Sequence, residues 1–324
     1  MSDLDLKAIL EFTVALAYDA GKLIIEGSEA ILQPASVVDT KKNAVDLVTE
    51  YDVRVEELVK ERLGEKYPSF QFIGEESYAA GARPEWTDEP TWCVDPIDGT
   101  TNFVHGFPMV ALSIALLVER RSVLGIIYNP FLETMYTGIK DGGSYVTKGG
   151  PEGVRRKLPF ANPAQPLPSL SKAQLAVEWG FDRRIPPLAA RAESFHRLVS
   201  DAANGIHKAR MAHSLRSLGT SAMNFVYVAQ GAFDMYWEIG PWPWDVAAGV
   251  IIAQEAGGLV TGSHEVFDSS KDTITFGEVG EEILTSRKYL VIRPIGDSEN
   301  ETGRETQKRI ISEFYETVID YDTV

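Results

Sequence analysis

The first part of the chain has two stretches in which apolar residues recur at helical spacing. Over residues 4–27 the apolar side chains recur three or four positions apart, which predicts an amphipathic helix with Gly27 at its end. Residues 46–49 form a short extended piece. The helical spacing returns over residues 52–63, and Gly64 is the expected end of that second helix.

The next part is rich in strand-forming residues. Residues 70–75 predict a strand that ends in acids, and residues 92–94 predict another that breaks at Pro96. Short apolar runs separated by turn residues then predict a mostly antiparallel sheet. Its strands are expected at residues 110–118, 123–128, 134–140 and 143–146.

Residues 149–171 are rich in proline, glycine and basic residues, which predicts a long loop at the boundary between two halves of the chain. Strands and helices alternate after it. The expected strands are 173–177, 215–218, 232–238 and 259–261, and the expected helices are 187–203, 244–256 and one that opens at 219–221.

The pattern thus predicts three parts. Residues 1–150 form an α+β half with the large sheet, and residues 151–294 form an α/β half. Residues 295–324 form an acidic tail, in which residues 309–318 predict one amphipathic helix.

Composition narrows the class of protein. The chain has 324 residues, of which 44% are hydrophobic, enough for one large domain or two tightly packed ones. A formal net charge of −16 argues against nucleic acid or an anionic membrane as partner, since both reward a positive surface.

The compartment follows from what the sequence lacks. Cys93 is the single cysteine, so no intrachain disulfide forms, and we expect a reducing, cytoplasmic location. The first residues show no basic stretch followed by an apolar one, so no secretory signal is expected. The longest apolar runs, 109–118 and 246–253, are too short to span a bilayer.

Candidate chemistry lies in five carboxylates at or near the ends of apolar elements. They are Glu75, Glu76, Asp95, Asp98 and Asp245. Oxygen ligands in this number favour Mg²⁺, Mn²⁺ or Ca²⁺ over Zn²⁺, which prefers nitrogen and sulfur. The histidines show no metal-ligand spacing and are interpreted as structural. Simpler explanations stay open, because acids at a strand end are usually solvated and an acid in a first helical turn suits the helix dipole.

The segment 92–103 makes the metal hypothesis specific. Asp95 and Asp98 can converge from the two ends of a turn, with the Ile97 carbonyl between them and free of a ladder partner. Gly99 can adopt a positive φ and let the backbone approach a phosphate, and the Thr100 hydroxyl can orient a water. A surface turn explains the same dipeptides, but the flanking residues are apolar rather than solvated.

Several stretches together resemble the inositol monophosphatase family, which belongs to the Mg²⁺-dependent, lithium-sensitive phosphatases. The resemblance runs from about residue 6 to residue 292. It is carried by residues 95–103 (DPIDGTTNF), 74–77 (GEES), 244–249 (WDVAAG), 46–52 (DLVTEYD) and 255–258 (EAGG). It implies a layered α-β-α-β-α sandwich of the inositol monophosphatase and fructose-1,6-bisphosphatase type, and a homodimer.

The resemblance also implies roles at the metal centre. Two to three Mg²⁺ ions per site are expected, with Mn²⁺ as an alternative metal and Li⁺ as an inhibitor. The implied ligands are Glu75, Asp95, the Ile97 carbonyl, Asp98 and Asp245. Glu75 and Thr100 would position the attacking water, with Asp95 beside them.

For the substrate, the resemblance places Gly99 and Thr100 at the phosphate and Asp98 and Asp245 at neighbouring hydroxyls. Gly219, Thr220, Ser221 and Glu238 would face the alcohol. Lys41, Asp52 and Glu76 would support the site from behind the ligands.

These roles predict a phosphomonoesterase for myo-inositol monophosphate or a similar small polyol phosphate. A sugar phosphate, 3′-phosphoadenosine phosphate or a quinate-pathway role stays open, because the loop at 149–171 and the aromatic stretch 240–244 depart from the family pattern. A non-catalytic relative that senses metal or phosphate is the alternative from another class.

Overall fold

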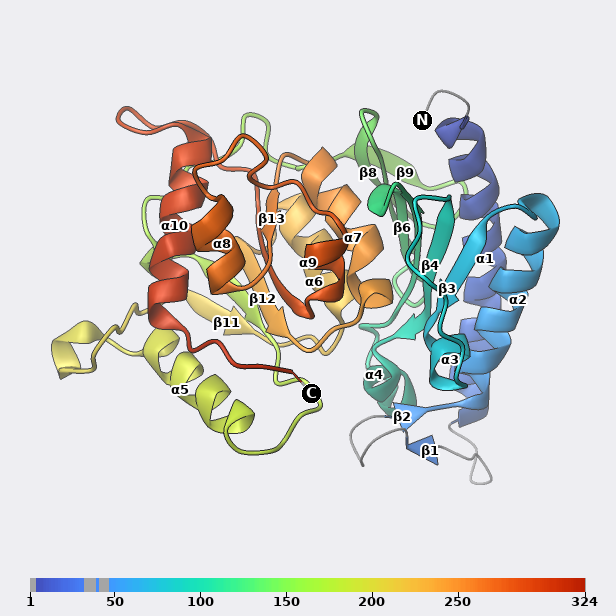
Figure 1. Cartoon of the computed structure of the whole chain (residues 1–324), viewed down its shortest axis with the longest axis horizontal. Helices are drawn as coiled ribbons and strands as arrows, with labels where there is room; N and C mark the ends of the chain where they lie inside the picture. The colour runs from blue at the N-terminus through green and yellow to red at the C-terminus, as the bar shows by residue number, and fades with distance from the viewer. Residues whose placement is uncertain (1–3, 32–38, 41–46, 324) are drawn as a thin grey trace.

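The computed structural model describes residues 4–31, 39–40 and 47–323. Within these residues no helix is long and apolar enough to cross a membrane. Two sheets and the helices around them form alternating layers (Figure 1).

The larger sheet has seven strands in the order β3-β4-β5-β6-β7-β8-β9. Only β3 and β4 pair in parallel, and the other neighbours are antiparallel. The strands are β3 (Gln71–Gly74), β4 (Thr91–Asp98), β5 (Ala111–Val118), β6 (Arg121–Asn129), β7 (Thr134–Ile139), β8 (Gly143–Lys148) and β9 (Val154–Lys157). A mostly antiparallel sheet is thus confirmed.

The smaller sheet has five strands in the order β11-β10-β12-β14-β13. Its strands are β10 (Gln174–Val177), β11 (Ser214–Arg216), β12 (Met235–Ile239), β13 (Leu259–Thr261) and β14 (Lys288–Ile292). A separate short pair is formed by β1 (Asp39–Thr40) and β2 (Leu47–Val48).

Helices cover both faces of both sheets. Helices α1 (Leu6–Ile31) and α2 (Glu50–Lys66) pack on the outer face of the larger sheet, and α6 (Ser221–Gln230) and α7 (Pro243–Glu255) lie between the two sheets. The outer face of the smaller sheet is covered by α5 (Pro187–Val199), α8 (His264–Ser270) and α10 (Gly303–Thr317). The expected α-β-α-β-α sandwich is confirmed.

Short helices complete the fold. They are α3 (Glu75–Ala79), α4 (Thr100–His105), α9 (Glu281–Thr285) and two 3₁₀ turns at Leu170–Lys172 and Ala202–Asn204. Both α3 and α4 begin where a strand of the larger sheet ends, so residues at these junctions lie at one edge of that sheet.

Several predicted element ends are wrong. The helix predicted over 187–203 ends at Val199, and the strand predicted over 232–238 begins at Met235. Helix α1 continues past Gly27, where the glycine serves close packing, since a side chain there would lie 2.5 Å from the Tyr51 ring. Gly64 lies inside α2, which ends at Lys66. Strand β4 runs through Pro96, since its pairing with β5 is irregular between Asp95 and Asp98, where the missing N–H costs little.

The expected long loop after Gly149 contains an added strand, β9, at the edge of the larger sheet. The expected division of the chain at residue 150 stays a prediction, although this strand continues the sheet beyond it.

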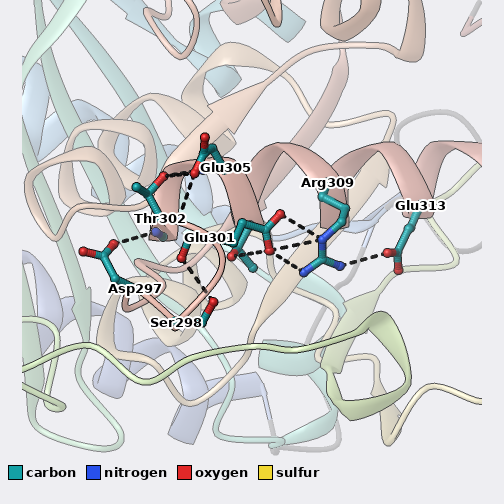
Figure 2. A network of polar contacts seen from close by, with 9 residues as sticks. Asp297, Ser298, Glu301, Thr302, Glu305, Arg309 and Glu313 are labelled. Carbon is teal, nitrogen blue, oxygen red and sulfur yellow. Dashed lines mark hydrogen bonds and ion pairs between the residues drawn. The ribbon is translucent and has the colours of Figure 1, made fainter.

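The C-terminal part is more ordered than its acidic composition indicates. Thr302 and Glu305 form a capping box at the start of α10, and Arg309 pairs with Glu301 and Glu313 (Figure 2). This pairing with Arg309 holds the pKa of the Glu301 carboxyl below its usual range. Ile310, Ile311 and Phe314 are buried against the smaller sheet, so the helix belongs to the core.

Candidate active site

Three carboxylates from separate parts of the chain converge at the edge where β3 and β4 end. Glu75 opens α3, Asp95 lies in β4, and Asp245 lies in the first turn of α7. Each offers an oxygen, and these oxygens lie within 4.8 Å of one another. Strand pairing between β3 and β4 brings the first two together, and α7 packs against this sheet to bring the third.

The electrostatics of this group fit a cation. Burial, followed by the charges of Glu75, Asp245 and Asp98, raises the pKa of Asp95 well above its usual range. Burial and the charge of Glu75 raise the pKa of Asp245 to about 7. Such carboxylates repel one another and lack water, so a divalent ion that neutralises them stabilises their ionised forms. The donor set consists of oxygens, which suits a hard metal.

Asp98 lies outside the converging group of three. Its Oδ2 accepts hydrogen bonds from the Thr220 hydroxyl at 2.5 Å and from the Ala222 N–H at 2.6 Å, both at the start of α6. Burial and the charge of Asp245 raise the pKa of Asp98 well above its usual range. Asp98 therefore links the larger sheet to α6, and its charge interacts with that of Asp245 in the converging group.

The backbone around Ile97 differs from the expectation in one respect. The Ile97 N–H donates to Asp95 Oδ1 at 3.0 Å, and the Ile97 carbonyl, expected without a partner, accepts from the Thr100 hydroxyl at 3.1 Å. The same hydroxyl lies 3.2 Å from Asp52 Oδ1. A carbonyl oxygen has two lone pairs, so it can accept this bond and still face a cation.

Gly99 has the predicted positive φ, at 93°. A side chain at this position would lie 2.9 Å from the Met109 carbonyl and 3.2 Å from the Gly219 carbonyl. Glycine is therefore required both by the conformation and by the close approach of the chain.

Two expected supporting residues are placed by hydrogen bonds. Asp52 accepts from the Thr49 N–H and hydroxyl at the start of α2, which fixes the carboxylate that reaches Thr100. Glu76 is buried in α3, and its N–H donates to Glu56 at 2.7 Å. Lys41, expected near the site, lies outside the described residues.

The expected substrate residues, apart from Asp245, line a cavity of 430 Å³. Glu75, Asp98, Gly99 and Thr100 line it where β3 and β4 end. Gly219, Thr220, Ser221 and Glu238 line it as well. Burial and the nearby charge of Glu178 raise the pKa of Glu238 to about 8. The Ser221 and Tyr236 hydroxyls both donate to Glu238, which fixes its position.

The sequence stretch 240–244, expected to shape the pocket wall, lies beside the centre rather than along this cavity. Trp242 stacks on Trp244 with ring centroids 5.3 Å apart, and the Arg287 guanidinium lies 4.0 Å from the centre of the Trp242 ring. The backbone N–H of Trp242 donates to Asp245 Oδ2 at 2.6 Å, so the start of α7 in this stretch holds the Asp245 carboxylate in place. Trp179 and Phe181 line the cavity instead.

Sequence reasoning missed Glu178, at the end of β10. Its Oε1 accepts from the Leu218 and Gly219 N–H groups at 2.6 and 3.0 Å and from Asn224 Nδ2 at 2.7 Å. Its Oε2 accepts from the Ser217 hydroxyl at 2.5 Å. This buried carboxylate holds the segment that carries three of the expected substrate residues. A glutamate directly after an apolar strand was the signal available in the sequence.

A family model described as the inositol monophosphatase family matches residues 5–316. The chain belongs to this family. Family members are metal-dependent phosphatases that act on small phosphorylated substrates. The resemblance inferred from the sequence is thus confirmed, and the acidic centre corresponds in chemistry to what such phosphatases need.

Two fungal relatives match this family member along nearly its whole length. Protein qutG of Emericella nidulans is 41% identical, over 98% of this chain and 96% of that protein. Quinic acid degradation cluster protein x of Neurospora crassa is 37% identical with the same coverage. Inositol monophosphatase 1 of Bos taurus is 38% identical over 82% of this chain and 90% of that protein.

Among solved structures, the extragenic suppressor protein suhB from Bartonella henselae superimposes with a TM-score of 0.70 at 25% identity. The match covers 94% of this chain and 98% of that chain. The layered fold is therefore that of this family.

Proposed function

We propose that this protein is a Mg²⁺-dependent phosphomonoesterase that hydrolyses myo-inositol monophosphate or a similar small polyol phosphate. The observation that carries the proposal is the convergence of Glu75, Asp95 and Asp245, because Glu75 also lines the cavity that Glu238 lines. One end of such a cavity suits cations and a phosphate, and the other suits the hydroxyls of a polyol.

The metal ions, when bound, neutralise phosphate charge and activate a water for in-line attack. Glu75, Asp95, Asp98, Asp245 and the Ile97 carbonyl would hold them. Two to three Mg²⁺ ions would bind per site, Mn²⁺ could replace them, and Li⁺ would inhibit.

The chain's own groups would orient the reactants. Glu75 and the Thr100 hydroxyl position the attacking water, and the contact between Thr100 and Asp52 limits the rotation of that hydroxyl. The N–H groups of Gly99 and Thr100 donate to the phosphate, and Gly99 suits this role because its φ of 93° is a conformation that other residues rarely adopt. Glu238, held by Ser221 and Tyr236, contacts the hydroxyls of the leaving alcohol.

The proposal includes a cytoplasmic homodimer without nucleic-acid or membrane partners. The net charge of −16 argues against nucleic acid and anionic membranes, and the buried, unpaired Cys93 suits a reducing compartment. The homodimer is carried over from the family resemblance alone.

The substrate has two enzyme alternatives. The names of the fungal relatives favour a phosphate ester formed in quinate metabolism. A sugar phosphate or 3′-phosphoadenosine phosphate is the other, and kcat/KM across a panel of these esters separates them. A metal- or phosphate-sensing protein without activity remains the alternative outside enzymes.

Phosphate release with and without Mg²⁺, then with added Li⁺, tests the proposal. Asp98→Asn should abolish hydrolysis, because the charged ligand is lost. The circular dichroism spectrum and unfolding transition should remain near native, because the amide keeps one oxygen that can accept from the Thr220 hydroxyl and the Ala222 N–H. Asp272→Asn, which changes an exposed aspartate paired with Lys308, serves as the charge-matched control. Metal-independent activity, or near-normal turnover by Asp98→Asn, would reject the assignment.

A further inference from the structure

The lining of the cavity contains a cation that the proposed mechanism does not use. Residues 178–184 leave the end of β10 and pass along the cavity, and Glu178, Trp179, Gly180, Phe181 and Arg183 line it. Among the described lining residues Arg183 is the only basic one.

This wall is held by specific contacts. The buried Arg191 of α5 donates from Nη1 to the Asp182 carbonyl at 2.6 Å and from Nε to the Tyr321 hydroxyl at 2.5 Å. Gly180 has a φ of 58°, and a side chain there would lie 2.9 Å from Arg191 Nη2. The turn is therefore set by glycine and by a buried guanidinium, which fixes the course of the chain on either side of Asp182.

The two neighbours of Arg183 pair with each other. Asp182 Oδ1 accepts from the Arg184 N–H at 3.0 Å and from its Nε at 2.9 Å, and Asp182 Oδ2 lies 2.6 Å from Arg184 Nη2. This pairing occupies Arg184. No acceptor in the described part of the chain forms a hydrogen bond or ion pair with the Arg183 side chain.

The acids of the cavity are already engaged elsewhere. Glu178 accepts four hydrogen bonds from the segment around Gly219, and Glu238 accepts from Ser221 and Tyr236. Glu75 belongs to the converging group of three carboxylates, and Asp98 accepts from the Thr220 hydroxyl and the Ala222 N–H. Arg183 is thus a positive group facing a cavity whose negative groups have other partners.

We infer that Arg183 binds a second anionic group on the substrate, so that the site favours phosphate monoesters that also carry a carboxylate. This inference rests on the proposed phosphatase function. A guanidinium matches a carboxylate with two parallel hydrogen bonds. A carboxylate is favoured over a second phosphate because its single charge balances one arginine, whereas a phosphate would leave excess negative charge beside four acidic residues.

The test compares two esters that differ only in this group. Shikimate 3-phosphate carries a phosphate and a carboxylate on one ring, and its methyl ester has the same ring without the charge. The wild-type enzyme with Mg²⁺ should hydrolyse the acid with the higher kcat/KM. In Arg183→Gln this preference should fall roughly tenfold, the range for loss of a charge-assisted contact at an exposed site, mainly through KM for the acid.

Matched variants separate this role from a general charge effect. Arg216→Gln removes an exposed positive charge from β11, where the side chain forms a hydrogen bond only with the neighbouring Leu215 carbonyl among the described residues. This variant should keep the wild-type preference. Arg183→Lys keeps the charge without the fork and should retain part of the preference.

The outcomes for the inference and for the proposed function differ. The carboxylate subsite is overturned if the wild type hydrolyses the acid and its methyl ester with equal kcat/KM, or if Arg183→Gln loses equally on both. In either case, hydrolysis of inositol monophosphate still supports the proposed phosphatase function. Absence of Mg²⁺-dependent hydrolysis of every ester overturns both.

Discussion

Replacement of Glu178 tests whether residues 217–224, which carry the expected substrate residues Gly219, Thr220 and Ser221, are held in place by a buried hydrogen-bond acceptor. Glu178 is 8% exposed, and its Oε1 accepts from the Leu218 and Gly219 N–H groups and from Asn224. Glu178→Ala leaves these donors without that acceptor. Each buried donor left without an acceptor costs about 1–3 kcal/mol in the free energy of unfolding. Because Glu178 lines the cavity, water can reach these donors, and we expect a cost near the lower end of that range for each.

The expected loss for Glu178→Ala is therefore about 3 kcal/mol in the free energy of unfolding, or about 6 °C in Tm for a domain of this size. Activity should fall as well. Thr220, in the released segment, bonds Asp98, and a displacement of about 1 Å at a reacting centre can cost about 100-fold in rate.

Urea unfolding and kcat/KM for inositol monophosphate measure the two effects. Glu178→Gln keeps one oxygen for the Leu218, Gly219 and Asn224 donors and replaces the oxygen that accepts from Ser217 with an amide nitrogen, so it should cost about 1 kcal/mol. Glu299→Ala, at an exposed position, should change stability by less than about 0.5 kcal/mol. A Glu178→Ala variant with wild-type unfolding midpoint and kcat/KM refutes the reasoning, as do equal losses in the Ala and Gln variants.

Two further predictions concern the acidic centre and the cavity wall. The pKa of Asp245 is raised from 3.8 to about 7 in the folded chain without metal, so its contribution to stability is full below pH 3.8 and is lost as the pH rises toward 7. Urea midpoints in EDTA should fall over that window, and added Mg²⁺ should remove the fall; a flat profile in EDTA contradicts the burial of these charges. Gly180→Ala should cost about 1–2 kcal/mol, since φ is 58° and the new methyl group would lie 2.9 Å from Arg191. Gly64→Ala, in a helix with open space around it, should instead be neutral or stabilising by about 0.5–1 kcal/mol, and equal unfolding midpoints for the two variants would argue against strain at Gly180.

Local patterns predicted elements well where a continuous apolar run is bounded by turn residues. The antiparallel strands β5 to β8 and helix α7 follow directly from apolar runs bounded by turn residues. Predictions failed where a residue's local tendency was overridden by its neighbours in space. Gly27 lies inside α1, where it gives room to the Tyr51 ring, and Pro96 does not end β4 because the pairing with β5 is irregular there.

The C-terminal part was underestimated for a related reason. The sequence predicted an acidic tail with one amphipathic helix at residues 309–318. The observed helix α10 already begins at Gly303, and its apolar side chains are buried against the smaller sheet. Pairing of Glu301 and Glu313 with Arg309 also reduces the cost of the acidic residues (Figure 2).

The sequence alone determined the types of residue at the centre, namely carboxylates at element ends and a glycine that permits a close approach, and through its resemblance it determined the family. Those features are local, because they depend on residue chemistry and on backbone freedom at single positions. Tertiary structure decided which groups meet. It brought Asp245 to Asp95, tied Asp98 to the start of α6, buried Glu178 beneath the substrate segment and left Arg183 facing the cavity. Such contacts join elements far apart in the chain, and they arise only when the sheets and helices pack.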